Sequence, residues 1–332
     1  MKKGNIDRFL ASIEKKTKSK VLVYITNDLK HPFGCQISTD ALSLFKNILR
    51  KQGKIKNRTL ILNTNGGLLD AAWPIVSLVR EYTTDKFEVI IPSKALSAGT
   101  LISIGADKIH MCDGSFLSPI DPTKHFSINN GGNIEQKQCS VEDIMGFIKF
   151  AKYKTGLRDQ AALTEILKLA TKEFDPSLIG SVNRTHGLIR NLSQKIIKTR
   201  KDTRKSGVDA DRISKCLIED LLSHQHLISL DEATEIGLDY ASRINASLQK
   251  DIFDLFDYYK TEMHLEEKSQ EIAELLRNIS TTESKIVTIG ACLHSAGLKY
   301  NHVTEANLSS MPAGPGKITA NINIQKQSWS KL

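Results

Sequence analysis

Apolar runs alternate with helical segments along the first third of the chain. Residues 21–26, 59–63, 87–91 and 108–112 are short and largely apolar, and these runs predict buried strands. Between them, residues 40–51 place apolar side chains at helical spacing, residues 68–82 predict a second helix, and residues 97–106 resemble a short buried helix. Strands separated by helices imply a parallel sheet.

The pattern changes after Asp113. Residues 127–139 are polar, contain a run of asparagine and glycine at 129–133, and predict a flexible loop. Residues 141–222 predict helices. Ser229 and Glu232 form a capping box that opens a further short helix, and Gly237 ends it.

The C-terminal part combines one helix with strands. Residues 251–279 predict a long amphipathic helix, and residues 285–289 and 318–324 predict a small β tail joined through a Gly-Pro-Gly turn. The predicted fold is therefore α/β, with a helical extension and a small C-terminal β tail. We divide it into a catalytic core over 1–125, a helical region over 126–245 that completes the active site, and a long helix with a β-hairpin tail over 246–332.

Composition indicates a globular protein with a basic stretch. The chain has 332 residues, of which 40% are hydrophobic and 25% charged, as in ordinary globular domains. The formal net charge is +9, and the basic excess concentrates in residues 190–205. This stretch fits a solvated helix face that runs into a basic loop, or a site for an anionic partner such as a membrane surface. It holds no aromatic residues to stack bases, which argues against nucleic acid as the partner.

Several classes of protein are disfavoured by what the sequence lacks. No run approaches the ~18 apolar residues of a membrane-spanning helix, and no apolar run follows the basic N-terminus as in a signal peptide. The five cysteines form no CxxC pair, and the histidines form no HExxH or HxxEH motif, so we expect neither a metal site nor a cofactor. These features favour a protein of the reducing cytoplasm.

A glycine turn ends the second predicted strand. Asn65, Gly66 and Gly67 follow the strand and precede a helix. Glycines allow positive φ angles and let a substrate approach main-chain N–H groups, while a helix N-terminus favours negative charge. The turn therefore fits an oxyanion site, although a phosphate-binding turn or a plain tight turn has the same composition.

Ser97 occupies the corresponding position after the third predicted strand. It lies among small residues where the next helix begins, and the N–H of the following residue, Ala98, can point at the same spot as the N–H of Gly67. Acyl transfer needs two donors that converge where negative charge develops. This arrangement predicts that Ser97 is a nucleophile; the structural alternative is an ordinary helix N-cap.

Together, these two motifs resemble the Clp protease and signal peptide peptidase A group within the crotonase-like fold. The runs at 104–109 and 114–122, which includes Ile120-Asp121-Pro122, are similar to those of the serine dehydrogenase proteinase family, a branch of that group. The likeness continues through 175–190 and 223–238 to Trp329. It implies a Clp/crotonase-like spiral core of the ββα type, a nucleophile at Ser97, and an oxyanion hole formed by Gly66, Gly67 and Ala98.

The resemblance leaves the general base open. The histidine that serves Clp proteases falls on Ile120, which has no proton chemistry, and His125 lies further along the following loop. The signal peptide peptidase branch uses a lysine from the next helix, a role that burial can support by lowering the lysine pKa. Lys149 matches that position, and Lys137 matches another member's spacing.

A second candidate base lies before the capped helix. His224 occupies the neighbourhood of the third member of the Clp triad, whose aspartate position falls on Gln225, and His226 shares the ambiguity. A hydrogen-bonded structural histidine is the alternative for both. Asp121 is the candidate residue that orients the base, unless it only stabilises its own turn.

These observations predict a serine endopeptidase that cleaves a peptide or protein substrate through an acyl-enzyme on Ser97. The resemblance also implies a homo-oligomer. Two alternatives remain from the sequence: a binding or scaffold protein that kept the fold without catalysis, and an acyl-CoA enzyme. Crotonase-like acyl-CoA enzymes lack the serine and generally use carboxylates, so Ser97 argues against the second.

Overall fold

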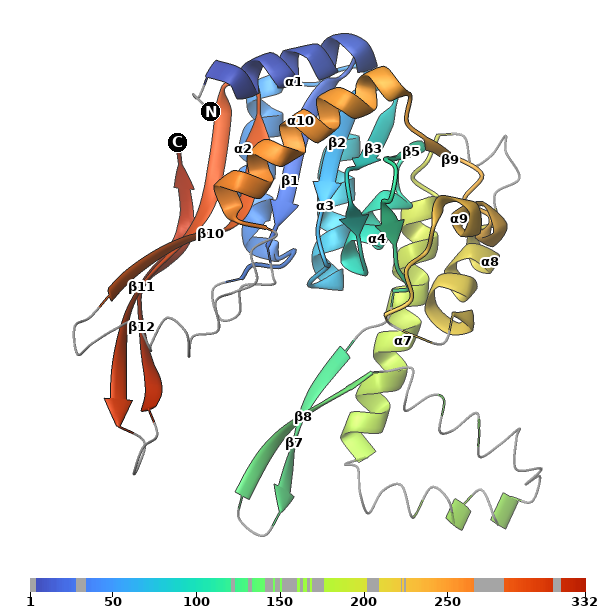
Figure 1. Cartoon of the computed structure of the whole chain (residues 1–332). Helices are drawn as coiled ribbons and strands as arrows, with labels where there is room; N and C mark the ends of the chain where they lie inside the picture. Colours follow the sequence, from blue (N-terminus) through green and yellow to red (C-terminus); the bar gives the residue numbers. More distant parts are fainter. Residues whose placement is uncertain are drawn as a thin grey trace.

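A mixed α/β fold is built around one large sheet. The computed structural model describes residues 4–27, 34–120, 123–130, 133–140, 146, 150, 160–161, 164–165, 168, 176–201, 209–221, 223, 225–265, 284–312 and 318–332. The eight-stranded sheet has the order β12-β11-β10-β1-β2-β3-β5-β9 (Figure 1). Its central strands are β1 (Lys20–Thr26), β2 (Arg58–Asn63), β3 (Phe87–Ile91), β5 (Lys108–Met111) and β9 (Ala241–Arg243). These five are parallel. The alternation of strands and helices predicts this for β1, β2, β3 and β5, whereas β9 is missing from the prediction.

Alternate residues of the central strands enter two separate cores. In β1, Leu22 and Tyr24 pack on one face of the sheet, and Val21, Val23 and Ile25 pack on the other. The first core contains α2 (Leu42–Gln52), α3 (Leu69–Glu81) and α4 (Ala98–Ser103), and the second contains α1 (Gly4–Thr17) and α10 (Ala246–Met263). Because both faces are covered, the strands are apolar along their whole length, which explains their sequence pattern.

A second, smaller sheet lies at the carboxyl ends of the central strands. It consists of β4 (Lys94–Ala95) and β6 (Phe116–Leu117), which are parallel. Isolated bridges extend it from Ala95 to Thr64 and from Leu117 to Ile228, and a further bridge joins Ile37 to Gly67. Each central strand from β1 to β3 therefore passes through a short extended segment before its helix. This repeat is the ββα-type spiral that the resemblance implies.

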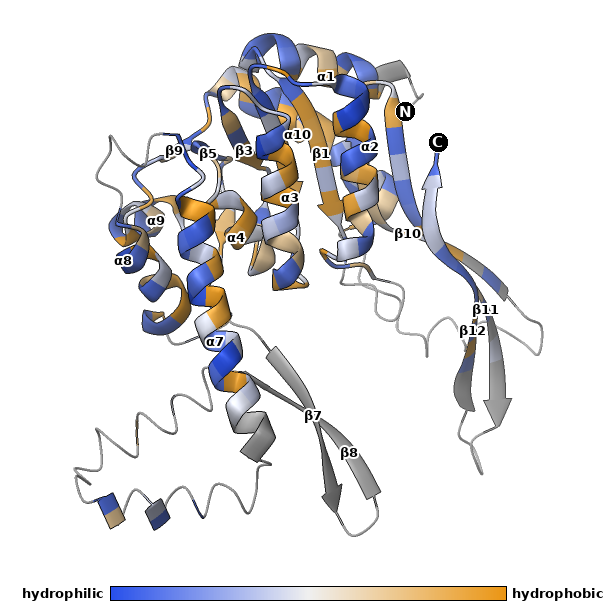
Figure 2. Ribbon diagram, turned by 180° about the vertical axis from the view of Figure 1, so that it is seen from behind, coloured by the Kyte–Doolittle hydropathy of each residue, from blue (hydrophilic) through white to orange (hydrophobic). Residues whose placement is uncertain are grey.

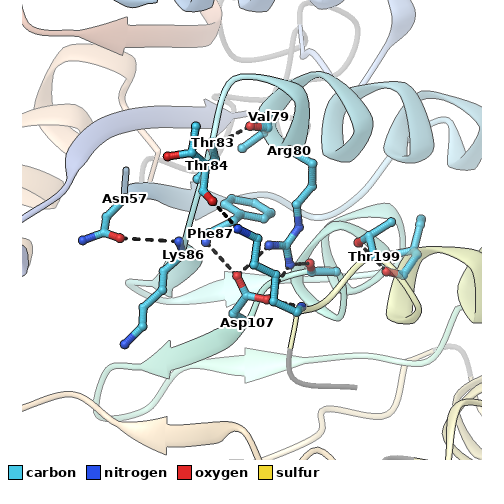
Figure 3. Close-up of polar contacts among 12 residues, drawn as sticks. Asn57, Val79, Arg80, Thr83, Thr84, Lys86, Phe87, Asp107 and Thr199 are labelled. Atoms are coloured by element: carbon cyan, nitrogen blue, oxygen red, sulfur yellow. Dashed lines mark hydrogen bonds and ion pairs between the residues drawn. The ribbon is translucent and has the colours of Figure 1, made fainter. Parts of the chain in front are cut away.

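An ion pair at the opposite end of this core joins four chain segments. Arg80 at the end of α3 binds both carboxylate oxygens of Asp107, at 2.6 and 2.9 Å. The same carboxylate accepts the N–H of Phe87 at 2.8 Å and the N–H of Lys201 at 2.9 Å (Figure 3). The four donors leave the carboxylate well satisfied although the side chain is buried. This network fixes α3 and the end of α4 against β3.

The segment after the core contains a hairpin where the composition predicts a flexible loop. β7 (Thr123–Asn130) pairs antiparallel with β8 (Asn133–Ser140), and Asn130 lies opposite Asn133. The prediction of a loop was wrong. Asn-Gly-Gly between stretches containing Phe126, Ile128 and Ile134 is a hairpin signal, because such turns need positive φ angles.

Helices follow the hairpin, as predicted for residues 141–222 and for the capped segment after Ser229. Among the described residues they are α7 (Pro176–Ile197), α8 (Ala210–Lys215), a π-helical turn η3 (Cys216–Asp220) and α9 (Leu230–Ile236). The Ser229 side chain accepts the N–H of Glu232, and Gly237 ends α9 with a φ of 110°, as the capping motif predicts. Figure 2 shows apolar and polar residues alternating along α7, whose buried residues join the first core.

The basic stretch lies partly on α7, and its described cations contact their own chain. Arg190 pairs with Asp211 at 2.8 Å, the Lys195 ammonium lies 3.9 Å from the ring centroid of Trp73, and Arg200 stacks on Tyr240. Arg190, Lys195 and Arg200 thus each contact a group of their own chain. Residues 202–205 of the stretch lie outside the described part.

The C-terminal β tail is larger than predicted and is not separate from the core. It consists of β10 (Ser284–Ser295), β11 (Leu298–Pro312) and β12 (Ile318–Lys331). β10 pairs antiparallel with β1, so the tail extends the main sheet (Figure 1). The two predicted strands are confirmed, but β11 is missing from the prediction. The helix before the tail, α10, starts and ends earlier than predicted, and residues 266–279 lie outside the described part.

Candidate active site

Ser97 lies at the start of α4 in a backbone conformation that few non-glycine residues adopt. As the N-cap residue it has φ 48° and ψ −109°. Such a conformation costs on the order of 1–3 kcal/mol and persists only where the surroundings enforce it. Ser97 is 8% exposed, and its hydroxyl has no hydrogen-bond partner among the described residues. The Ser97 Oγ atom nevertheless keeps some exposure to solvent. Ser97 therefore has an accessible hydroxyl on a strained turn, unlike an N-cap that binds its own helix.

Two side chains hold the Ser97 turn in place. Ser118, which follows β6, accepts the Ser97 N–H at 2.8 Å. Thr100 on α4 accepts the Ser118 N–H at 3.0 Å, and its hydroxyl lies within donating distance of the Ala95 and Ser118 carbonyl oxygens. Both side chains are buried. Our sequence reasoning missed them, because nothing in their local pattern indicates which amide they serve.

The glycine turn packs directly against Ser97. Gly66 and Gly67 have φ angles of 119° and 143°, which disfavour any residue with a Cβ atom. A Cβ atom on Gly66 would lie 3.0 Å from the Ser97 Cβ, and one on Gly67 would lie 2.3 Å from the Ile37 carbonyl oxygen. The sequence-predicted turn and the sequence-predicted nucleophile are therefore neighbours, and glycine is required at both turn positions.

The N–H groups around Ser97 differ in their availability. The Gly66 N–H donates to the Thr64 hydroxyl at 3.0 Å. The N–H groups of Gly67 and Ala98 have no acceptor among the described residues. Gly66 thus contributes its conformation, while the amides of Gly67 and Ala98 are free to receive a ligand. Two free main-chain donors beside an accessible hydroxyl match the components of an acyl-transfer site.

Most of the predicted base and orienting residues lie outside the part of the chain that the structure describes. Lys149, His224 and Asp121 all lie outside the described residues. Ile120, which occupies the place of the Clp histidine, is fully buried in the core, and its N–H donates to Leu217 O at 2.8 Å. His226 bonds to Glu232 on α9 at 2.6 Å, which supports its structural interpretation. His125 and Lys137 lie on the paired strands β7 and β8.

The described residues contain no group of three or more His, Cys, Asp or Glu side chains that is arranged to hold a metal ion. Within the same ranges, no helix is long and apolar enough to cross a membrane. Cys35, Cys112, Cys216 and Cys292 are free thiols.

Residues 6–131 match the family described as ClpP-like SDH-type serine proteinases. This segment of the chain is therefore similar to the family. The matched segment contains the glycine turn, Ser97 and Ser118, and thus every described component of the site. The proteinase match ends within the β7–β8 hairpin, before the helical region and the C-terminal tail.

Two relatives of the chain come from Methanocaldococcus jannaschii. The uncharacterized protein MJ0137 is 28% identical over 214 residues, or 64% of this chain and 62% of the relative. The uncharacterized protein MJ1495 is 25% identical over 205 residues, or 61% of this chain and 57% of the relative. The match thus spans about three fifths of the length of each relative.

Two solved structures are similar to the chain in fold. A mutant of the 1510-N membrane-bound stomatin-specific protease is 17% identical, with a TM-score of 0.38 over 70% of this chain and 85% of that one. ClpP1 from Listeria monocytogenes is 14% identical, with a TM-score of 0.38 over 72% of this chain and 99% of that one.

Proposed function

We propose that this chain is a serine endopeptidase that cleaves peptide bonds through an acyl-enzyme on Ser97. The observation that carries the proposal is the position of the Ser97 hydroxyl. It is accessible and unpartnered among the described residues, and it lies on a strained turn against Gly66. The match of residues 6–131 to the family of ClpP-like SDH-type serine proteinases supports the same chemistry.

In the proposed reaction, the Ser97 oxygen attacks the carbonyl carbon of the scissile bond, and its proton passes to the general base. The carbonyl oxygen becomes negatively charged and receives hydrogen bonds from the N–H groups of Gly67 and Ala98. Donors of this kind contribute roughly 3–4 kcal/mol each when they are preorganised. The carbon–nitrogen bond then breaks as the base returns the proton to the leaving amine, and a water molecule hydrolyses the ester on Ser97.

Lys149 and His224 are the candidate bases in this proposal, and Asp121 is the candidate orienting residue. A lysine requires a pKa lowered by burial, whereas a histidine titrates near neutrality without such help. Homo-oligomerisation and peripheral membrane contact through residues 190–205 remain predictions from sequence.

The proposal predicts that a fluorophosphonate probe labels the wild-type chain on Ser97. Ser97→Ala removes the nucleophile and should abolish labelling. Ser103→Ala is the matched control, because it removes another buried hydroxyl from α4, one that only donates to Gly99 O at 2.7 Å. Intact-mass spectrometry measures the labelled fraction. An unlabelled wild type, or equal labelling of wild type and Ser97→Ala, contradicts a serine hydrolase and favours a non-catalytic binding protein.

The same probe discriminates the two candidate bases. Replacing the residue that acts as the general base should lower the labelling rate on the order of 100-fold, because general-base catalysis contributes a factor of about that size. Lys149→Met and His224→Gln are compared over a range of pH. If neither variant slows labelling, neither residue is the base.

A further inference from the structure

The Gly66–Gly67 turn is braced from outside by a short segment of the chain. We call residues 34–41 the bracing segment; it includes η1 (Thr39–Ala41) and leads into α2. The Ile37 N–H donates to Gly66 O at 2.8 Å, and the Leu68 N–H donates to Ile37 O at 2.8 Å. Ile37 is thus hydrogen-bonded to the residues on both sides of Gly67. These two bonds fix the direction of the Gly67 N–H.

The opposite side of the bracing segment contacts the C-terminal tail. Cys35 Sγ lies 2.8 Å from His302 Nδ1 on β11, and Trp329 Nε1 on β12 donates to Asp40 Oδ2 at 2.8 Å. His302 and Trp329 are cross-strand partners. Their rings pack edge to face, with the ring centroids 5.4 Å apart. The two contacts therefore form one unit of the tail.

A third connection reaches the segment through the main chain. The Gly290 carbonyl of β10, at the bulge of that strand, accepts the Asn27 N–H at 2.7 Å. The Asn27 carbonyl in turn accepts the Cys35 N–H at 2.8 Å. All three strands of the tail thus contribute to holding residues 34–41.

The Cys35–His302 contact joins two uncharged groups. Burial, reinforced by the charge of Asp40, raises the pKa of Cys35 to about 12. Burial also lowers the pKa of His302, against the opposing effect of Asp40. A neutral thiol can then donate to the imidazole nitrogen. His302 is only 8% exposed, so this contact is well shielded from solvent.

We propose that the C-terminal tail, β10–β12, is a positioning element of the active site, which orients the Gly67 N–H through the bracing segment. The inference rests on the oxyanion role proposed above for Gly67. It assigns a function to a part of the chain that lies outside the matched family segment.

The test compares His302→Ala with a tail variant that leaves the bracing segment untouched. His302→Ala removes the contact to Cys35 and the support of Trp329, and Trp329→Phe removes only the donor to Asp40. The control is Ser295→Ala, since Ser295 anchors β10 to the Val21 carbonyl near the start of β1. Three quantities are measured for each full-length variant: the rate of fluorophosphonate labelling, hydrogen exchange of the Ile37 and Leu68 amides, and thermal unfolding.

His302→Ala should slow labelling on the order of 10-fold, because small displacements of a catalytic group carry large rate penalties. It should also accelerate exchange of the Ile37 and Leu68 amides. Trp329→Phe, the milder change, should shift both quantities in the same direction by less. Ser295→Ala should lower the unfolding temperature while leaving both quantities at wild-type values.

The outcomes separate this inference from the proposed function. If labelling and exchange stay at wild-type values in His302→Ala, the inference about the tail is overturned, and the proposed hydrolase function is unaffected. Equal shifts in Ser295→Ala and His302→Ala also overturn it, because they indicate general destabilisation. Faster exchange in His302→Ala, with a wild type that the probe does not label, supports the coupling and contradicts the hydrolase.

Discussion

The strained backbone of Ser97 is held by a hydrogen bond that its N–H donates to a residue outside its own turn. Its φ of 48° directs the N–H away from the helix and toward the Ser118 hydroxyl. A buried N–H without an acceptor costs about 1–3 kcal/mol, so this bond offsets part of the strain. Ser118 is therefore a positioning residue for the proposed nucleophile.

Ser118→Ala should destabilise the fold by about 1–3 kcal/mol and lower the rate at which the probe labels Ser97. The matched control is Ser115→Ala, because Ser115 Oγ is buried without a partner among the described residues and its loss leaves no group unsatisfied. Urea unfolding and labelling kinetics measure the two effects. Equal stability and equal labelling in the two variants would show that Ser118 does not hold the turn.

At the scale of elements, Asp107 links α3 to β3 through an ionised carboxylate. Burial opposes the ionisation of Asp107, but the hydrogen bonds and charge of Arg80 outweigh it. The N–H groups of Phe87 and Lys201 add to this, and the pKa of the carboxyl stays below its ordinary value. The contribution of this network to stability is therefore complete above the unfolded-state pKa of ~3.9 and is lost as the pH falls through the folded-state pKa.

Asp107→Asn should lower the free energy of unfolding near neutral pH, because it leaves the half-buried Arg80 guanidinium without its counter-charge. Breaking such pairs costs about 3–5 kcal/mol when they are fully buried. For Asp107→Asn we expect a loss of unfolding free energy in the lower part of that range. The difference between wild type and variant should shrink as the pH falls below ~4. Urea unfolding at pH 7, 5 and 3 measures it. A difference that is independent of pH would contradict an ionised Asp107 as the source.

At the scale of the whole molecule, the tail is joined to α10 through buried polar groups. Tyr259 on α10 lies 2.6 Å from His294 Nδ1 on β10, and Lys299 on β11 pairs with Glu262. Burial, together with the charge of Lys299, lowers the pKa of His294 to about 3. His294 is therefore neutral in the folded chain and must gain a proton on unfolding below its ordinary pKa.

This linkage predicts acid sensitivity of the assembled fold. The unfolded state binds the additional proton between pH ~6.5 and the folded-state pKa, so stability is complete above that window and falls within it by about 1.4 kcal/mol per pH unit. His294→Gln, which cannot titrate, should lose this part of the slope. Urea unfolding of both proteins at pH 7 and 5 measures it, and identical slopes would contradict a neutral buried histidine.

Local pattern was enough to predict the strands β1, β2, β3 and β5, the helices between them, and the capped helix α9. It was also enough to single out Gly67 and Ser97, because a Gly-Gly turn and a small-residue helix start follow directly from the backbone conformations they must adopt. It failed at the β7–β8 hairpin, where a turn signal was interpreted as flexibility, and it did not predict α1, β9 or β11.

The sequence by itself determined the α/β core, the glycine turn and the serine at the helix start, since these depend on residues close together in the chain. Only the tertiary structure decided that the turn and the serine are neighbours, that Ser118 accepts the Ser97 amide, and that the tail reaches the bracing segment. The physical reason is sequence separation: Ser97 and Ser118 are 21 residues apart, and Cys35 and His302 are 267 apart. Contacts between residues so far apart in the chain depend on how the elements pack, and the local sequence pattern does not predict them.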